Sequence, residues 1–157
     1  MGNATVYLVI FLFCSILIDG NDANISEQCL RCICHGRSGC YFMKNCANYS
    51  ISRKYWEDAG RPTVLDDSKD DPVSYENCKK DDNCIMQAMR QYIMPKSKDC
   101  DCDGTVDCKD FAAIHYYGDS CRFERFKNVY LFRLDNCLRE KGITHTKGWN
   151  KACTPDA

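Results

Sequence analysis

The sequence predicts a small, disulfide-rich α+β domain that is mainly helical and carries one short antiparallel hairpin. Two stretches, 84–93 and 126–138, have apolar residues at helical spacing. Residues 40–51 mix aromatic and polar side chains over a length that suits a small hairpin. The 14 cysteines among 157 residues indicate a fold held together by disulfides. These patterns alone do not select one arrangement within this class.

The N-terminus predicts export. Residues 6–18 form an apolar run interrupted only by Cys14 and Ser15. Its length is that of a secretory h-region and is short for a membrane span. We interpret residues 1–20 as a signal peptide cleaved between 20 and 23, and we expect a secreted protein with no membrane segment after cleavage. An uncleaved signal anchor is the alternative.

One domain is expected from 26 to 138, followed by a polar tail from 139 to 157. Ser26 is a suitable N-cap for a helix starting near Ile25 and continuing to Cys34. Ser38 and Gly39 mark a turn. Residues 61–75 are rich in Asp, Pro and Ser and lack periodicity, so they are expected to form an exposed loop.

The two apolar stripes are expected to face the core rather than a ligand. Pro95 ends the first of them. The stripes consist of Cys84, Ala88, Met89, Tyr92 and Ile93, and of Phe126, Val129, Tyr130, Leu134, Cys137 and Leu138.

The cysteine count is odd after export. Cys14 lies in the signal peptide, so 13 of the 14 cysteines reach an oxidising compartment and one is left over. Cys153 is the expected leftover because it lies in the polar tail. The spacing leaves the connectivity of the other cysteines open. The cysteines predicted to pair are Cys29, Cys32, Cys34, Cys40, Cys46, Cys78, Cys84, Cys100, Cys102, Cys108, Cys121 and Cys137.

The net charge of −1 argues against a nucleic-acid-binding protein, which would normally be basic. It also gives little general attraction to anionic bacterial walls.

Two segments carry a family resemblance. Residues 29–40 read CLRCICHGRSGC, and residues 46–62 read CANYSISRKYWEDAGRP. The first resembles the opening of the invertebrate-type lysozymes, the family that includes the leech destabilases. The second is similar to the pattern C-G-x-[YF]-Q-I-K-x-x-Y-W-x-D-C-G-[RK]-P at matching length. The order of later cysteines, with Phe111-Ala112-x-Ile114-His115 after Cys108, follows the family through Cys137.

This resemblance implies a small lysozyme arrangement of helices with one hairpin. It also implies a role in antibacterial defence or digestion. The reaction implied is hydrolysis of the β-1,4 bond between N-acetylmuramic acid and N-acetylglucosamine in peptidoglycan. The implied partner is therefore bacterial cell-wall peptidoglycan or a related glycan, and no cofactor is implied.

The chain differs from the family pattern at the positions of the catalytic carboxylates. Glycoside hydrolysis needs one carboxylic acid to protonate the leaving oxygen and a second carboxylate as nucleophile or stabiliser. The family acid stands before Ser-Gly, and here that residue is Arg37. The second carboxylate belongs to a segment that is shortened here to residues 41–45, which contain no acid. We therefore expect little or no hydrolysis. Glu57 and Asp58 are candidate substitutes, but both are read more simply as solvated charges.

Aromatic residues and one histidine are the candidates for sugar binding. Tyr49, Tyr55 and Trp56 could stack on pyranose faces. His115 occupies the first position of the family loop H-N-G-G-P. The alternative is that the aromatic residues belong to the core.

Residues 99–110 match the spacing of a twelve-residue calcium loop, with a glycine at position 6. The candidate ligands are Asp99, Asp101, Asp103, Asp107 and Asp110. Position 12 is Asp rather than the bidentate Glu, and cysteines restrict the loop. The alternative is a disulfide-bridged acidic surface loop without an ion.

Asn24 and Asn48 begin N-glycosylation sequons in an exported chain. The leading hypothesis is a secreted lysozyme homologue that has lost most or all hydrolysis and can still bind cell-wall glycan. The alternatives are a non-catalytic extracellular module that binds glycan, protein or calcium on the same scaffold, and a working enzyme with relocated carboxylates.

Overall fold

Helices build the part of the chain that the structure describes. The computed structural model describes residues 25–39, 51–65, 67–122 and 126–143. The elements are α2 (Glu27–Ser38), α3 (Arg53–Asp58), α4 (Ser74–Cys78), α5 (Asp82–Ile93), η2 (Met94–Lys96), α6 (Cys108–Tyr117), η3 (Gly118–Ser120) and α7 (Asn128–Glu140). No β-strand occurs within the described ranges.

The mainly helical, disulfide-rich character predicted from the sequence is therefore confirmed. The predicted hairpin lies outside the described residues except for Ile51, which is buried. The signal peptide, the residues around its expected cleavage point and the asparagines of both sequons also lie outside them.

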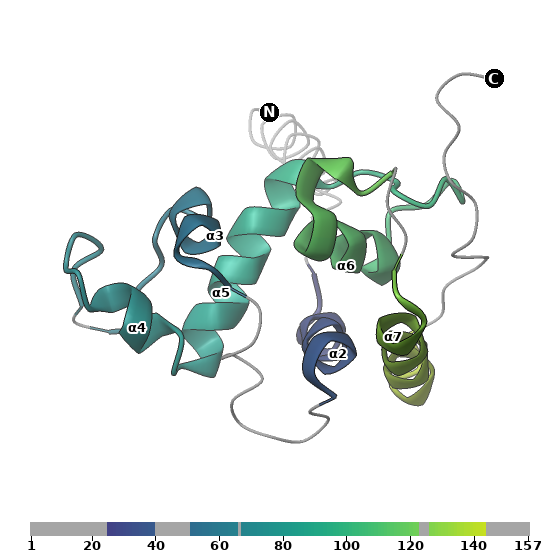
Figure 1. The fold of residues 1–157 in the computed structure, drawn as a ribbon, viewed down its shortest axis with the longest axis horizontal. Helices are drawn as coiled ribbons and strands as arrows, with labels where there is room; N and C mark the ends of the chain where they lie inside the picture. The colour runs from purple at the N-terminus through teal and green to yellow at the C-terminus, as the bar shows by residue number, and fades with distance from the viewer. Residues whose placement is uncertain (1–24, 40–50, 66, 123–125, 144–157) are drawn as a thin grey trace, which may run out of the picture.

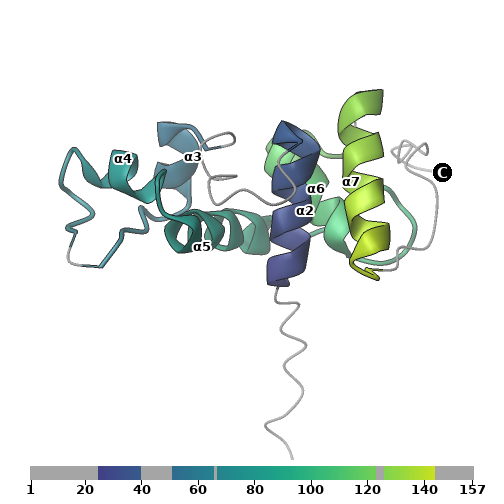
Figure 2. The same ribbon diagram turned by 90° about the horizontal axis from the view of Figure 1, so that it is seen from below.

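Helix α5 runs through the middle of the molecule. Helices α3 and α4 lie on one side of it, and α2, α6 and α7 lie on the other (Figure 1). Helices α2 and α7 lie side by side in both views (Figure 2). The best-buried residues of α2, α5, α6 and α7 form one apolar core, which includes Leu30, Ile33, Met89, Ile93, Ile114, Leu134 and Leu138.

Helix α2 begins where the sequence predicts and ends four residues later than expected. The Ser26 hydroxyl accepts a hydrogen bond from the backbone N–H of Cys29 (3.1 Å), which caps the first turn. The helix continues to Ser38 because Gly39 supplies the left-handed conformation that stops it, with φ of 74°. The Gly39 N–H donates to the His35 carbonyl (2.7 Å).

The first predicted stripe is confirmed as core. Its members on α5 are buried, apart from Tyr92, which is partly buried. In the second stripe Tyr130, Leu134, Cys137 and Leu138 are buried on α7, whereas the prediction for Val129 is wrong because its side chain is 61% exposed. Successive residues of a helix are separated by about 100°, so the face that buries Tyr130 and Leu134 turns Val129 outward.

The predicted exposed loop at 61–75 is exposed over much of its length, but its end folds back. Ser74 begins α4 and is fully buried, and its hydroxyl donates to the Ser68 carbonyl (2.6 Å). Tyr75 is also buried, and its hydroxyl donates to the carbonyl of Ile51 (2.8 Å). These two hydrogen bonds anchor the end of the loop to the domain.

Two of the disulfides, Cys29–Cys108 and Cys32–Cys137, connect helices that are distant in sequence. The pairs between described cysteines are Cys29–Cys108, Cys32–Cys137, Cys78–Cys84 and Cys100–Cys121. Cys102 is also disulfide-bonded. Cys34 is buried in α2. The predictions for Cys40, Cys46 and Cys153 fall outside the described residues.

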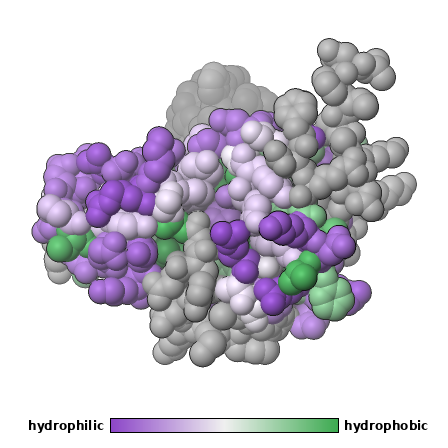
Figure 3. Space-filling view, viewed as in Figure 1, coloured by the Kyte–Doolittle hydropathy of each residue, from purple (hydrophilic) through white to green (hydrophobic). Residues whose placement is uncertain are grey.

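The described surface seen in Figure 3 is mostly hydrophilic, with apolar residues showing over α7. The large apolar residues that α7 exposes are Val129 and Phe132. Within the described residues, no helix has both the length and the apolar character required to cross a membrane.

Removing the Cys32–Cys137 disulfide should destabilise the domain more than removing Cys78–Cys84. The first closes a sequence separation of 105 residues and the second only 6. With Cys29–Cys108 still closed, the loop that Cys32–Cys137 closes in the unfolded chain shortens to about 30 residues, so the chain-entropy account gives about 3.7 and 2.3 kcal/mol for the two pairs. All four cysteines are buried, so replacing each pair by alanines removes similar packing.

We expect the free energies of unfolding of the two double-alanine variants to differ by about 1.5 kcal/mol. Urea unfolding followed by circular dichroism measures this difference. Equal destabilisation by both pairs would contradict the entropic origin of the effect.

Candidate functional site

Arg37 lies in the last turn of α2, where its side chain is exposed. Its guanidinium carbon is 5.1 Å from the centroid of the Tyr116 ring on α6, which is the geometry of a cation–π contact. A positive charge in the last turn also interacts favourably with the helix dipole. The preceding residue, Gly36, is buried against Tyr130 and Leu134 of α7. Helical geometry then directs the next side chain away from α7.

Tyr55 and His115 meet although 60 residues separate them. Tyr55 lies on α3, whose start is capped by the Ser52 hydroxyl accepting from the Tyr55 N–H (3.1 Å). A hydrogen bond of 2.9 Å joins Tyr55 Oη and His115 Nδ1. The tyrosine is only 9% exposed. The structure therefore brings together two of the residues predicted to bind sugar.

The charge of Arg37 affects the protonation of His115 in this pair. Burial, and then the nearby Arg37 charge, lower the pKa of His115 to about 4. Burial raises the pKa of Tyr55. At neutral pH the pair is therefore an uncharged phenol bonded to an uncharged imidazole, with a permanent cation close by.

No carboxylate pairs with Arg37 or His115 among the ion pairs of the described residues. The two candidate substitute acids, Glu57 and Asp58, are exposed on α3. Asp58 is held by Lys54, whose Nζ lies 2.6 Å from Asp58 Oδ1, and this contact raises the pKa of Lys54. Both carboxylates therefore lie at the surface, in contact with solvent.

Trp56 lies in the core. Its side chain is 3% exposed, and its indole N–H donates to the Pro62 carbonyl (2.7 Å). Its ring packs near Tyr75, with centroids 5.8 Å apart. The side chain is therefore buried in this conformation, and stacking of Trp56 on sugar stays a prediction. The prediction for Tyr49 falls outside the described residues.

Tyr92 is a neighbour of the site that the sequence assigned only to a core stripe. Its ring stacks on Tyr55 with centroids 3.7 Å apart, and Lys96 Nζ lies 3.6 Å from its centroid. Burial, followed by the charges of Asp58 and Asp119, raises its pKa. Helical spacing places Tyr92 beside core residues of α5, but no sequence pattern indicates that it meets α3.

The five aspartates of the acidic loop separate into two groups. Asp107 and Asp110 form the capping box of α6, with Asp107 accepting from the Lys109 N–H (2.7 Å). Asp110 is buried and accepts from the N–H groups of Cys100 (2.6 Å), Asp101 (3.3 Å) and Asp107 (2.8 Å). These two are occupied by the backbone, so a calcium loop that uses all five predicted ligands is not formed.

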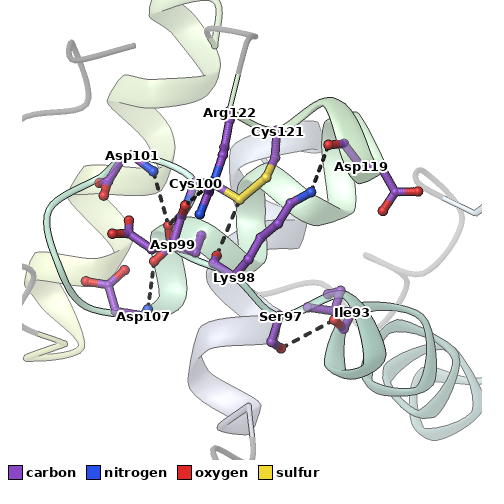
Figure 4. Close-up of a disulfide and its surroundings, with 11 residues drawn as sticks. Ile93, Ser97, Lys98, Asp99, Cys100, Asp101, Asp107, Asp119, Cys121 and Arg122 are labelled. Carbon is purple, nitrogen blue, oxygen red and sulfur yellow. Dashed lines mark hydrogen bonds between the residues drawn. A yellow bond between two sulfur atoms is a disulfide. The ribbon is translucent and has the colours of Figure 1, made fainter. Parts of the chain in front are cut away.

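The other three aspartates of the loop lie close together. Oxygens of Asp99, Asp101 and Asp103 lie within 4.8 Å of one another. Burial and the adjacent carboxylates, Asp103 first, raise the pKa of Asp101 to about 6. Figure 4 shows the carboxylates of Asp99 and Asp101 close together at the turn of the loop, near the Cys100–Cys121 disulfide.

Replacing His115 with glutamine should change how stability depends on pH. The folded-state pKa of His115 is depressed to about 4, so between about pH 6.5 and 4 the unfolded chain binds a proton that the folded chain does not. The parent protein therefore loses stability at this position as the pH falls through that window. As the pH falls from 7 to 4, the free energy of unfolding of the variant should rise relative to that of the parent by on the order of 2 to 3 kcal/mol.

Urea unfolding of both proteins at pH 7, 6, 5 and 4 measures this gain. The aspartates with raised pKa values act in the opposite direction, but they are common to both proteins and cancel in the difference. A difference that is constant with pH would contradict a depressed His115 pKa.

Comparison with known proteins gives the context of this site. The Destabilase family profile matches residues 26–137. The chain is 29% identical over 131 residues to a lysozyme of Magallana gigas, which covers 78% of this chain and 82% of that protein.

Two further relatives are more partial matches. A lysozyme of Ostrea edulis is 32% identical over 103 residues, with 60% of this chain and 67% of that protein covered. Invertebrate-type lysozyme 3 of Caenorhabditis elegans is 28% identical over 104 residues, with 61% and 74% covered. No solved structure matches significantly. Because the family profile spans most of the chain, and the relatives are lysozymes, this protein belongs to the destabilase family of invertebrate-type lysozymes.

Proposed function

We propose that this chain is a secreted lysozyme-like protein of antibacterial defence or digestion that binds bacterial cell-wall peptidoglycan and hydrolyses it weakly or not at all. The family reaction is cleavage of the β-1,4 bond between N-acetylmuramic acid and N-acetylglucosamine. The observation that carries the proposal is Arg37, which stands at the position of the family acid and lies exposed beside Tyr116 and His115.

A guanidinium cannot perform the first step of the reaction. The leaving oxygen of a glycosidic bond must receive a proton, and arginine keeps its protons under all physiological conditions. General acid catalysis contributes about 10² to 10⁴-fold, which is about 3 to 5 kcal/mol of barrier. The segment 41–45, where the second family carboxylate is expected, contains no Asp or Glu. The loss therefore extends to both required groups.

The neighbouring groups are poor replacements. With a pKa near 4, about one His115 side chain in a thousand is protonated at pH 7, so it rarely has the proton that an acid must donate. Tyr55 is a still weaker acid because burial raises its pKa. Asp58 is paired with Lys54 at the surface rather than placed in an apolar environment that would keep it protonated.

Arg37 has properties that suit binding. An exposed guanidinium over an aromatic ring presents several N–H donors in a fixed plane that matches a carboxylate. Peptidoglycan carries carboxylates on its stem peptides and on lactyl groups that bear no peptide. Family membership and this geometry together support a role in holding the polymer.

Export is supported by the apolar run at 6–18 and by the disulfides. Glycosylation at Asn24 and Asn48 belongs to the same proposal, because sequons are modified only in exported chains.

The catalytic part is tested by release of reducing ends from insoluble peptidoglycan. We expect the parent protein to be at least about 10²-fold slower than a relative that has both carboxylates. Arg37→Glu supplies an acid and Arg37→Gln only removes the charge, so activity that appears in the first variant alone would identify the missing acid as the cause. Clear lysis by the parent protein would defeat the proposal.

The binding part is tested by sedimentation with the same insoluble peptidoglycan. We expect the parent to sediment, and Arg37→Gln to bind about fivefold more weakly, because one charge-assisted contact of about 1 kcal/mol is lost. Arg31→Gln is the matched control: it removes an exposed arginine of the same helix that is paired with Glu27. A parent that does not sediment would favour a protein-binding module instead.

A further inference from the structure

Three aspartates at alternate positions of one loop direct their oxygens toward a common point. Asp99, Asp101 and Asp103 precede α6, and one carboxylate oxygen from each lies within 4.8 Å of the others. Three like charges at this separation repel one another unless a cation lies between them. Clustered acids alone do not establish a site, so the hydrogen bonds of the individual oxygens are decisive.

Two of these carboxylates each keep one buried oxygen without a hydrogen-bond partner. Asp101 is 7% exposed; its Oδ1 accepts from the Asp103 N–H (3.2 Å), and its Oδ2 is buried and unpartnered. Asp99 Oδ2 accepts from the Gly104 N–H (3.0 Å), whereas its Oδ1 is also buried and unpartnered. Leaving a charged oxygen buried in this way is costly. A bound cation would remove that cost.

The fold holds these carboxylates in place. The Cys100–Cys121 disulfide fastens the loop to the segment after α6. Beneath the loop, the buried Asp110 accepts from the N–H groups of Cys100 and Asp101 (2.6 and 3.3 Å). Figure 4 shows Asp99 and Asp101 on either side of Cys100 at this anchored point. The ordering that a flexible acidic loop would undergo on binding has already occurred here.

We propose that Asp99, Asp101 and Asp103 bind one divalent cation of the calcium class, with water completing its coordination. All three side chains offer oxygen, and the flanking Cys100 and Cys102 are disulfide-bonded, so no thiolate is available for a softer metal.

Calcium accepts six to eight oxygens in irregular geometry, whereas magnesium demands a near-ideal octahedron. The site differs from a complete twelve-residue calcium loop because Asp107 and Asp110 cap α6. With three carboxylates, affinity in the range of extracellular modules is expected, with a Kd of about 10⁻⁴ to 10⁻³ M.

Isothermal titration of the purified full chain with calcium chloride tests the proposal directly. The expected result is one site with a Kd in that range. The midpoint of thermal unfolding should rise by about 3 to 6 °C at a calcium concentration ten times the Kd. Magnesium chloride at equal concentration controls for ionic strength and should give a clearly smaller rise.

Asp101→Asn separates binding from a structural role. Asparagine keeps an Oδ1 that can accept from the Asp103 N–H but removes one negative charge. We expect the calcium-dependent shift to disappear, while the unfolding temperature without calcium stays equal or rises because repulsion is relieved. Asp119→Asn, an exposed acid of η3 outside the cluster, should keep the full shift.

Three results would overturn the proposal. They are a parent protein that gives no calcium heat and no thermal shift, an Asp101→Asn variant with the parent's Kd, and equal responses to calcium and magnesium. Each can be measured without reference to peptidoglycan, so the outcome is independent of the proposed function.

Discussion

The close contact between α2 and α7 determines where the most unusual residue of this chain lies. Gly36 allows it, because a Cβ at this position would lie 3.1 Å from Cζ of the buried Tyr130. The Cys32–Cys137 disulfide then locks the two helices together. With one face of α2 committed to α7, Arg37 is directed toward Tyr116 of α6. The position of the cation is thus a consequence of packing on the neighbouring side of its helix, about 100° away.

That position sets the chemistry of the site. The Arg37 charge adds to burial in keeping His115 uncharged, and burial keeps the Tyr55 hydroxyl protonated. The three described residues at this point are a cation, a neutral imidazole and a phenol. They can hold a polar or anionic ligand, and none of the three readily donates a proton at neutral pH, which is why we propose weak or absent hydrolysis.

Local sequence patterns predicted a helix well where its caps and its apolar face are formed by residues close together in the sequence. The Ser26 cap and the apolar face of α5 both follow from short-range preferences. The same patterns could not predict which helices pack against one another. The sequence pattern assigned Val129 to the core because apolar residues at helical spacing can lie on either of two adjoining faces of a helix. Only the contact of α7 with α2 shows that the face of Tyr130 and Leu134 is the buried one. The sequence also did not indicate that Trp56 is buried with its indole N–H bonded to the Pro62 carbonyl.

The sequence by itself determined the family, the cysteine-rich character, and the presence of arginine where an acid is expected, because these depend only on which residues occur in which order. Tertiary structure alone decided the disulfide partners, the Tyr55–His115 contact, and the division of the acidic loop into two capping aspartates and three converging ones. The physical reason is that hydrogen bonds and electrostatic effects depend on distance and burial. Both are fixed only when the chain has folded, whether the partners are 60 residues apart, as Tyr55 and His115 are, or neighbours in one loop, as the aspartates are.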